Sequence, residues 1–338
     1  MKIFLVGGAV RDKILGNNPR DKDYVVLDGN ERDFLKKFPK AKKIGKKIPV
    51  YIYKGKEFTL SPFKTIEEDL WDRDLTINAL AMDESGKIYS LPSTLEDIKN
   101  KVLRPVRAKN FIKDPLRIYR VARFLAHMPE YTLHDELKEV MKRVGTDISL
   151  LKKISPERVA AELEKSLTGK RPGLFLQILW RYNALTYWFN EFKNFKNTDL
   201  NHLVEVMNKL HNCKESVFMG MCHKLSLEDF YTFYKRLKLS NRLYYSGKFA
   251  ILYKEEGKNY IQISDEKKVD LLETLDKKGL FKEFFSFIFA ETSKDYYPQA
   301  HKDLITIKKV HLPQKYWNKG ALSGRILKEL KAKELSKG

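Results

Sequence analysis

Three acidic residues near the start of the chain have the types and spacing to bind divalent cations. Asp21 and Asp23 stand two residues apart where a strand is expected to begin, so both carboxylates point to the same side. Glu57 begins a later β-rich run that we expect beside that strand. Hard carboxylate oxygens suit Mg²⁺, and a pair of such ions can clamp the attacking and leaving oxygens of phosphoryl transfer. The alternatives are an exposed Asp-Lys-Asp turn and an ordinary surface glutamate.

A Gly-Gly turn precedes these acids. Gly7 and Gly8 follow the apolar run from Lys2 to Val6 and open an expected helix that carries Arg11. Glycine lets backbone N–H groups approach a phosphate, and the N-terminus of a helix favours its negative charge. The apolar run is too short for a signal peptide, so we expect a buried strand. On its own, this turn is a weak indication of function.

The charge of the chain favours a polyanionic partner. Its 338 residues include 65 Lys and Arg against 44 Asp and Glu, a formal net charge of +21, and 12% are aromatic. Basic side chains release counterions when they neutralise phosphates, and aromatic rings supply stacking platforms for bases. The alternative is a solvated, lysine-rich surface. We therefore expect nucleic acid as the partner.

Other classes of protein are excluded by the sequence pattern. No uninterrupted apolar run approaches the roughly 20 residues that cross a bilayer. Cys213 and Cys222 are the only cysteines and form no CxxC pattern, so there is neither a disulfide framework nor a zinc signature. We expect a cytoplasmic protein with no membrane partner.

Hydrophobic patterning changes along the chain. Short β-rich runs at 2–6, 24–27, 48–53 and 57–60 predict a mixed sheet within residues 1–107. From about Ile112 onward the apolar positions recur at helical spacing, and Ser155-Pro156 is typical of a helix start. We therefore predict an α+β fold, with one sheet followed by helices.

The motifs occur in an order that resembles one family. After the Gly-Gly turn, the DxD and the strand acid comes a segment, residues 73–80, that nearly reproduces the signature RRDxTINAL. Over residues 1 to about 185 the chain resembles the class II tRNA nucleotidyltransferase and poly(A) polymerase family. The resemblance implies a polymerase-beta-like catalytic head, in which Arg73, Asp74 and Asn78 contact the sugar and triphosphate of a nucleotide.

A second segment matches the family's neck. Asp114 and Arg117, followed by Arg120 and Arg123, resemble the EDxxR element and the RxxRF helix that follows it. In the family this Asp and Arg read the base edge in place of a template, because the Asp accepts from the amine of C or A and the Arg donates to ring acceptors. The i, i+3 spacing places both on one helix face. A structural salt bridge is the alternative.

A later motif and several departures complete the resemblance. Glu157, Arg158 and Glu162 match a neck motif whose implied role is to support the base-reading helix. The chain departs from the family pattern at four positions: Asp72 for Arg, Ser90 for Asp, Thr94 for Gly and Lys113 for Glu. His223-Lys224 is the nearest trace of an HD phosphohydrolase motif. Because lysine cannot replace the metal-binding Asp, we predict a core or surface histidine and no functional HD site.

The predicted function is template-independent addition of C, C and A to the 3′ end of tRNA from CTP and ATP, with release of pyrophosphate. We predict a catalytic head at 1–107, a base-recognising neck at 108–190, and a helical body and tail at 191–338 that bind the acceptor and T arms. Mg²⁺ is the expected cofactor, and no protein partner is implied. The alternatives are a CC-adding enzyme, favoured by the short loop 61–65, a poly(A) polymerase, and an RNA-binding protein with a decayed site.

Overall fold

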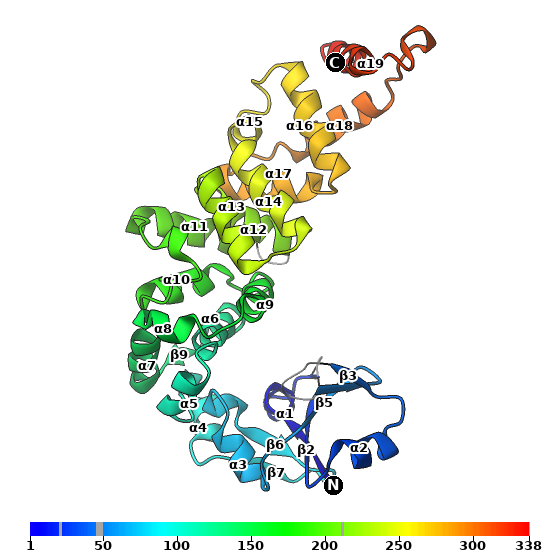
Figure 1. Cartoon of the computed structure of the whole chain (residues 1–338). Coiled ribbons are helices and arrows are strands. Elements are labelled where there is room, and N and C mark those ends of the chain that lie inside the picture. Colours follow the sequence, from blue (N-terminus) through cyan, green and yellow to red (C-terminus); the bar gives the residue numbers. More distant parts are fainter. Residues whose placement is uncertain (20–21, 45–49, 211–212, 338) are drawn as a thin grey trace. The chain divides into compact units, whose positions relative to one another are not determined.

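The computed structural model describes residues 1–19, 22–44, 50–210 and 213–337 (Figure 1). Contacts divide the chain into two compact units, one of residues 1–121 and 130–153 and the other of residues 122–129 and 154–338. The division falls within helix α6 (Arg117–His127). Each unit has its own buried core and is described by itself.

The first unit is built on a mixed sheet. Among the described residues, seven strands are ordered β3-β4-β5-β2-β1-β6-β7. β2 and β5 are parallel, while the other neighbours are antiparallel. The bounds are β1 (Lys2–Val6), β2 (Asp23–Leu27), β3 (Lys42–Ile44), β4 (Val50–Tyr53), β5 (Lys56–Leu60), β6 (Leu80–Met82) and β7 (Ile88–Ser90). The predicted mixed sheet is confirmed.

Alternation along the strands places a core on each face of this sheet. Val25 and Leu27 join one apolar cluster, which also contains Leu70 of α3 (Ile66–Trp71). Val26, which points the opposite way, joins a second cluster around Phe34 of α2 (Glu31–Lys37). The period of two thus buries both faces of β2 under helices. The unit's other helices are α1 (Gly8–Ile14), η1 (Thr76–Asn78), α4 (Thr94–Lys99), α5 (Ala108–Lys113), α7 (Asp135–Thr146) and α8 (Ile148–Leu151).

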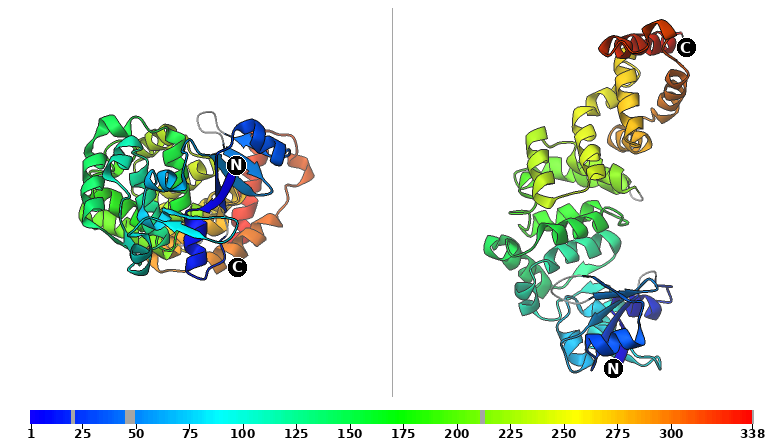
Figure 2. Two further views of the ribbon diagram at one scale, coloured as in Figure 1. Left: turned by 90° about the horizontal axis from the view of Figure 1, so that it is seen from below. Right: turned by 45° about the vertical axis from the view of Figure 1, so that its right-hand side comes forward.

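From residue 108 onward the described chain is mostly helical, as predicted; in Figures 1 and 2 this is the part coloured from blue-green through green and yellow to red. The exception among the described residues is β9 (Thr132–Leu133), which pairs in parallel with β8 (Val102–Leu103). The helices of the second unit after α6 are α9 (Pro156–Ser166), α10 (Gly173–Arg181), η2 (Asn190–Phe192), α11 (Asn197–Lys209), α12 (Lys214–Cys222), α13 (Leu227–Leu237), α14 (Asn241–Leu252), α15 (Lys254–Lys258), α16 (Asp265–Lys277), α17 (Phe281–Thr292), α18 (Tyr297–Lys308), η3 (Gln314–Tyr316) and α19 (Ala321–Leu335).

The predicted start of α9 is confirmed. Ser155 is the N-cap residue and Pro156 opens the helix, although the Ser155 side chain donates or accepts no capping hydrogen bond. Val159 and Leu163 are fully buried, as the helical spacing of apolar residues predicts. No helix in the described part of the chain combines the length and the apolar character that crossing a membrane requires.

Two helical glycines offer a matched test of packing in the second unit. A Cβ at Gly173 would lie 2.5 Å from the Val204 carbonyl oxygen, whereas a Cβ at Gly324 would meet nothing within 4 Å. We expect Gly173→Ala to lower the free energy of unfolding by about 1–3 kcal/mol, because the backbones of α10 and α11 must separate.

The control is Gly324→Ala, which should leave the free energy of unfolding unchanged or raise it by about 0.5–1 kcal/mol, because alanine favours an open helical position. Urea unfolding followed by far-UV circular dichroism measures both variants. Equal stability of the two would contradict the described packing of α10 against α11.

Candidate functional site

Two of the three predicted cation ligands lie side by side on neighbouring strands. Asp23 begins β2 and Glu57 lies in β5, and the parallel register pairs these two residues. Register partners on parallel strands point to the same face of a sheet, and both residues are exposed. The predicted adjacency of the two strands is confirmed. Asp21 lies outside the described residues.

The donor set fits a hard divalent cation. Two carboxylates held in register repel one another, and a cation between them removes that repulsion. Carboxylate oxygens are the ligands that Mg²⁺ prefers, whereas softer metals favour sulfur or imidazole. Asp23 and Glu57 therefore offer two hard oxygen ligands to a divalent cation at this end of the sheet.

The Gly-Gly turn connects β1 to α1, as predicted. Gly7 has φ +67°, a conformation that favours glycine, and its N–H donates to the Leu80 carbonyl at 2.9 Å. A Cβ at this position would lie 3.1 Å from Nη1 of Arg73. The amide of Gly7 is thus occupied within the fold. Its contribution is to bring the turn, with Gly8 as the first helical residue, close to the guanidinium of Arg73.

A hydrogen-bonded network joins four of the predicted nucleotide-binding residues. Arg11 Nη1 donates to Asn78 Oδ1 at 2.8 Å, and Asn78 Nδ2 donates to Asp74 Oδ1 at 3.2 Å. From the other side, Arg120 Nε donates to Asp74 Oδ2 at 2.7 Å. The Leu75 N–H is a third donor to Asp74, at 2.8 Å. The network fixes α1, η1 and the first turns of α6 around one carboxylate.

Asp74 carries its charge although it is only 5% exposed. Burial acts to raise the pKa of the Asp74 carboxyl, but the charge and hydrogen bond of Arg120, the Leu75 amide and the charge of Arg117 together hold this pKa well below its usual range. Asp74 is therefore ionised at neutral pH. Its oxygens face protein donors, so its most direct effect is to orient Arg120 and Asn78.

Arg73 is held beside the Gly-Gly turn. Its Nε and Nη2 donate to Asp69 Oδ2 at 3.2 and 2.9 Å, and its Nη1 donates to the Asn78 carbonyl at 3.2 Å. The Arg73 side chain remains 19% exposed. Asp69 stands one helical turn before Arg73 and was not among the residues singled out from the sequence, although the i, i+4 spacing of an acid and an arginine indicates such a pair.

The expectation that Asp114 and Arg117 share one helix face is wrong. Asp114 ends α5 in an extended conformation, φ −132° and ψ 91°, and Arg117 is the first residue of α6. The cause is Pro115, because a proline disfavours the helical conformation in the residue before it. The two side chains therefore project from a helix end and a helix start.

Arg117 is anchored through the backbone of Asp72. Its Nη2 donates to the Asp72 carbonyl at 2.6 Å, while Nη1 is buried and has no hydrogen-bond partner among the described residues. Burial lowers the pKa of the Arg117 guanidinium, although the charges of Asp74, Asp114 and Asp72 act in the opposite direction. Arg117 thus keeps one buried donor group that no described residue satisfies.

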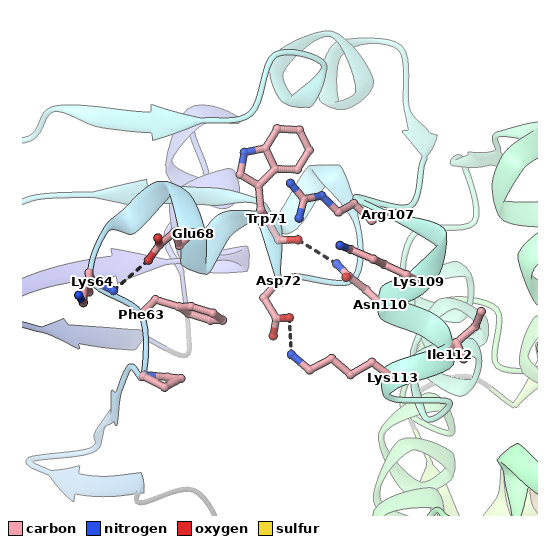
Figure 3. A pocket seen from close by; sticks show the side chains of 11 residues that line it. Phe63, Lys64, Glu68, Trp71, Asp72, Arg107, Lys109, Asn110, Ile112 and Lys113 are labelled. Atoms are coloured by element: carbon pink, nitrogen blue, oxygen red, sulfur yellow. Dashed lines mark hydrogen bonds and ion pairs between the residues drawn. The ribbon is translucent and has the colours of Figure 1, made fainter.

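Two of the departures from the family pattern contact each other. Lys113 Nζ donates to Asp72 Oδ1 at 2.6 Å (Figure 3). Asp72 stands where the family has Arg, and Lys113 stands where it has Glu. The two positions therefore still carry opposite charges, but the signs are exchanged between them. The two substitutions therefore form one compensated change. Neither departure removes a residue of the network around Asp74.

These two residues also line a cavity of about 980 Å³ in the first unit. Phe63 and Lys64 lie on its other side, and the Arg107 guanidinium lies 4.4 Å from the Trp71 ring (Figure 3). Asn110 Nδ2 donates to the carbonyls of Trp71 and Arg73 at 2.9 and 2.8 Å and so ties α5 to the end of α3. Basic and aromatic side chains of this kind suit phosphates and bases.

The remaining predicted residues lie in the second unit. Arg123 Nε donates to Glu162 Oε2 at 2.5 Å, and Glu162 is 4% exposed. Glu157 is exposed and pairs at 2.6 Å with Lys238, the residue that follows α13, while Arg158 is exposed. The Arg123–Glu162 pair ties α6 to α9 and supports that part of α6. Glu157 instead ties the start of α9 to the end of α13.

Comparison with known families agrees with this arrangement. Residues 47–104 match the family described as the poly A polymerase head domain, and residues 130–196 match one described as the probable RNA- and SrmB-binding site of polymerase A. The multifunctional CCA protein of Pseudoalteromonas atlantica is 38% identical over 213 residues. Both matched segments and the similar relatives point to the tRNA nucleotidyltransferase and poly(A) polymerase family, which the chain resembles. The resemblance inferred from the motifs is confirmed.

The chain spans about half the length of the curated relatives it matches. The Pseudoalteromonas protein is covered over 52% of its length and 56% of this chain. The CCA-adding enzyme of Coxiella burnetii is 35% identical over 215 residues, which cover 56% of it and 57% of this chain. Sequence similarity to these relatives thus covers just over half of the chain.

Solved structures share the fold over a larger part of the chain. The Bacillus stearothermophilus CCA-adding enzyme in complex with CTP has a TM-score of 0.77 at 24% identity and covers 97% of this chain and 87% of its own. The Thermotoga maritima CCA-adding enzyme complexed with tRNA_CCA has a TM-score of 0.70 at 21% identity and covers 100% and 88%. The fold of these enzymes is therefore shared over nearly all of the chain.

The ionised, buried Asp74 predicts a pH-dependent contribution to stability. Because its pKa is lowered on folding, its stabilising effect is present above the pKa of the unfolded carboxyl, about 4, and is lost as the pH falls through the folded value. We expect Asp74→Asn to lower the free energy of unfolding by about 3 kcal/mol at pH 7, because Arg120 loses its buried partner.

The difference in unfolding free energy between the wild type and Asp74→Asn should shrink as the pH falls below about 4. The control is Asp33→Asn, at an exposed position, which should change the free energy of unfolding little both at pH 7 and below about pH 4. Urea unfolding of each protein across this pH range provides the measurement. A difference that is independent of pH would contradict an ionised Asp74.

Proposed function

We propose that the chain adds C, C and A to the 3′ end of tRNA from CTP and ATP without a nucleic-acid template and releases pyrophosphate. The observation that carries this proposal is the Asp23–Glu57 carboxylate pair, in register on two strands of a head that resembles that of this family. Relatives are named CCA-adding enzymes, and enzymes of the same fold have been solved with CTP, ATP and tRNA. We assign the head to residues 1–107, the neck to 108–190 and the RNA-binding body and tail to 191–338.

Asp21, Asp23 and Glu57 are the residues that would hold Mg²⁺. Bound Mg²⁺ would neutralise the triphosphate and favour ionisation of the 3′-hydroxyl of the RNA. The protein then contributes mainly by positioning its substrates. The Gly7 turn lets a phosphate approach the backbone closely. Arg73, held by Asp69 beside that turn, supplies a fixed positive charge for the triphosphate.

Asp114 and Arg117 are the residues that we propose to read the base. Asp114 accepts a hydrogen bond from the exocyclic amine that cytosine and adenine share, and Arg117 donates to ring acceptors. The support is the buried Nη1 of Arg117, which lacks a partner among the described residues and would gain one from a base. Arg120 and the Asp74 network hold the helix that carries Arg117.

A specific feature favours a second candidate function, addition of C and C only. β5 ends at Leu60 and α3 begins at Ile66, so residues 61–65 alone connect the strand of Glu57 to the segment that carries Arg73. The resemblance to full CCA-adding relatives implies a longer flexible loop here, which helps the change from C to A. A short connection leaves less chain to rearrange around the larger base.

The carboxylate pair provides the direct test of catalysis. We expect Asp23→Asn and Glu57→Gln each to lower kcat for nucleotide addition by about a thousandfold or more, because several kcal/mol of charge stabilisation are lost. Binding of tRNA, measured by filter retention, should change little. The control Glu84→Gln lies in the exposed turn between β6 and β7 and should keep full activity. Full activity of an Asp23→Asn, Glu57→Gln double variant would remove the proposed site.

The exchanged charges at Asp72 and Lys113 predict a rescue. Lys113→Glu places two acids together and should lower kcat/KM for CTP and ATP about fivefold, because displacement of Asp72 disturbs the carbonyl that holds Arg117. Combining it with Asp72→Lys should restore most of the loss. The matched control is Lys109→Glu in the same cavity, which Asp72→Lys should not rescue. If Asp72→Lys makes Lys113→Glu worse, the compensated pair is the wrong explanation.

A further inference from the structure

One asparagine side chain holds the backbone on both sides of Asp72. Asn110 lies in α5 and is 3% exposed. Its Nδ2 donates to the Trp71 carbonyl at 2.9 Å (Figure 3) and to the Arg73 carbonyl at 2.8 Å. An amide nitrogen carries two hydrogens, so each carbonyl receives one of them. Asn110 thus fixes the chain directly before and directly after Asp72.

The carbonyl of Asp72 itself is held by the residue that we propose to read the base. Arg117 Nη2 donates to it at 2.6 Å. The carbonyl of Asp74 in turn accepts from the Val106 N–H at 3.0 Å. The segment 106–117 therefore binds four consecutive carbonyls. Because a helix leaves its last carbonyls without internal partners, this segment supplies partners for the end of α3.

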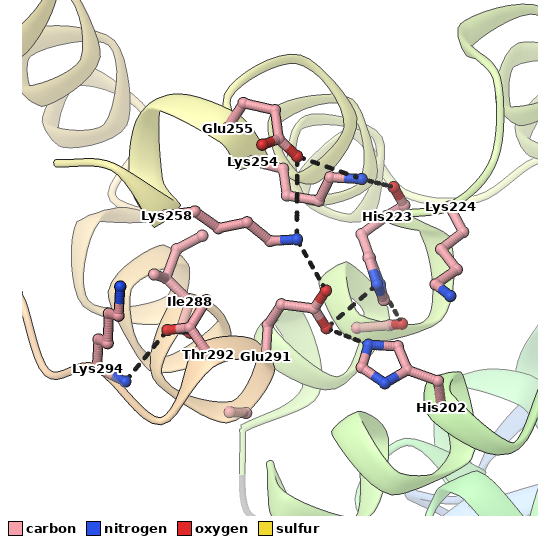
Figure 4. A network of polar contacts seen from close by, with 12 residues as sticks. His202, His223, Lys224, Lys254, Glu255, Lys258, Ile288, Glu291, Thr292 and Lys294 are labelled. Atoms are coloured by element: carbon pink, nitrogen blue, oxygen red, sulfur yellow. Dashed lines mark hydrogen bonds and ion pairs between the residues drawn. The ribbon is translucent and has the colours of Figure 1, made fainter. Parts of the chain in front are cut away.

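Arg117 differs from a buried polar group of the second unit in what surrounds it. His223 is a core histidine, and its Nε2 lies 3.3 Å from the Glu291 carboxylate (Figure 4). His202 and Lys258 contact the same carboxylate at 2.7 and 3.1 Å. Those side chains therefore satisfy one another within the fold. Arg117 Nη1, by contrast, has no hydrogen-bond partner among the described residues, and we assign it to the base.

The position of this Arg117 donor depends on the Asp72 carbonyl. A guanidinium is a rigid plane, so the hydrogen bond from Nη2 to that carbonyl also sets where Nη1 points. Any shift of the carbonyl therefore moves Nη1 with it. Asn110 prevents such a shift by holding the backbone on both sides. The same backbone carries Arg73, which we assign to the triphosphate. One amide thus sets the spacing between the phosphate-binding and base-reading groups.

We propose that Asn110 is a positioning residue for nucleotide selection. It acts through Arg117, because it fixes the Asp72 carbonyl and so keeps the guanidinium where it selects cytosine and adenine. This inference rests on the proposed function, since it requires Arg117 to read the base. Asn110 was not among the residues singled out from the sequence. A single asparagine gives no local sign of the two carbonyls that it holds in another segment.

Discrimination between CTP and UTP tests this role. The full chain extends a tRNA that lacks CCA with either nucleotide, and the ratio of the two kcat/KM values is compared among variants. Asn110→Leu keeps the size of the side chain but removes both donors. We expect it to lower this ratio about tenfold, mainly through a higher KM for CTP, because the carboxylate pair that serves the chemistry is untouched. A merely structural residue would lower both kcat/KM values equally.

Asn208→Leu is the matched control. The Asn208 side chain accepts a hydrogen bond from the Gly173 N–H at 2.9 Å and ties α11 to α10 in the second unit. Its loss should lower the melting temperature and leave the ratio unchanged. Asn110→Ser is a milder variant, which keeps one hydroxyl donor and should give an intermediate ratio. It provides the test if circular dichroism shows that Asn110→Leu does not fold.

The outcomes separate this inference from the proposed function. If the wild type adds C but a folded Asn110 variant keeps the wild-type ratio, the positioning role is overturned and the proposed function stands. An equal fall of the ratio in Asn208→Leu would also overturn it, because a general loss of stability would then explain the effect. If the wild type adds no nucleotide, the proposed function fails and the inference fails with it.

Discussion

The buried charge of Asp74 is the constraint on which the organisation of the first unit depends. A carboxylate that is 5% exposed is tolerated only if donors surround it, and three do: Arg120, Asn78 and the Leu75 amide. Asn78 extends the network to Arg11 in α1. The turn after β1, the short helix η1 and the start of α6 are thereby fixed by one charge. The network around Asp74 therefore positions the residues that we propose to contact the nucleotide.

The departures from the family motifs acquire a physical meaning in this setting. Asp72 and Lys113 differ from the family in opposite senses and form a hydrogen bond of 2.6 Å. Because the Asp72 carbonyl also holds Arg117, the exchanged pair maintains the anchor of a residue that we propose to read the base. In a decaying site, the two positions would change independently of each other, and the contact between them would be lost. The pairing therefore weighs against the alternative of an RNA-binding protein with a decayed site.

Short-range patterns predicted the fold and part of the site. Alternating residues predicted the sheet, and the β-rich run that begins with Glu57 was expected beside the strand of Asp23, which the structure confirms. We expected Asp74 to contact the nucleotide, but its side chain lies in a buried network. A sequence motif does not indicate whether a side chain is buried. Pro115 separates Asp114 from the helix of Arg117, a signal that was present in the sequence.

The most direct measurement is the sequence of the 3′ ends that the purified protein produces. Transfer RNAs lacking CCA, CA or only A are incubated with Mg²⁺ and each labelled nucleotide in turn, and the products are sequenced. The account predicts ordered incorporation of C, C and A, with U and G excluded by Asp114 and Arg117. Products that stop after CC would support the second candidate, in which the short loop 61–65 prevents the change to A. No incorporation into any of the three RNAs would contradict the assignment of this chain as a nucleotidyltransferase.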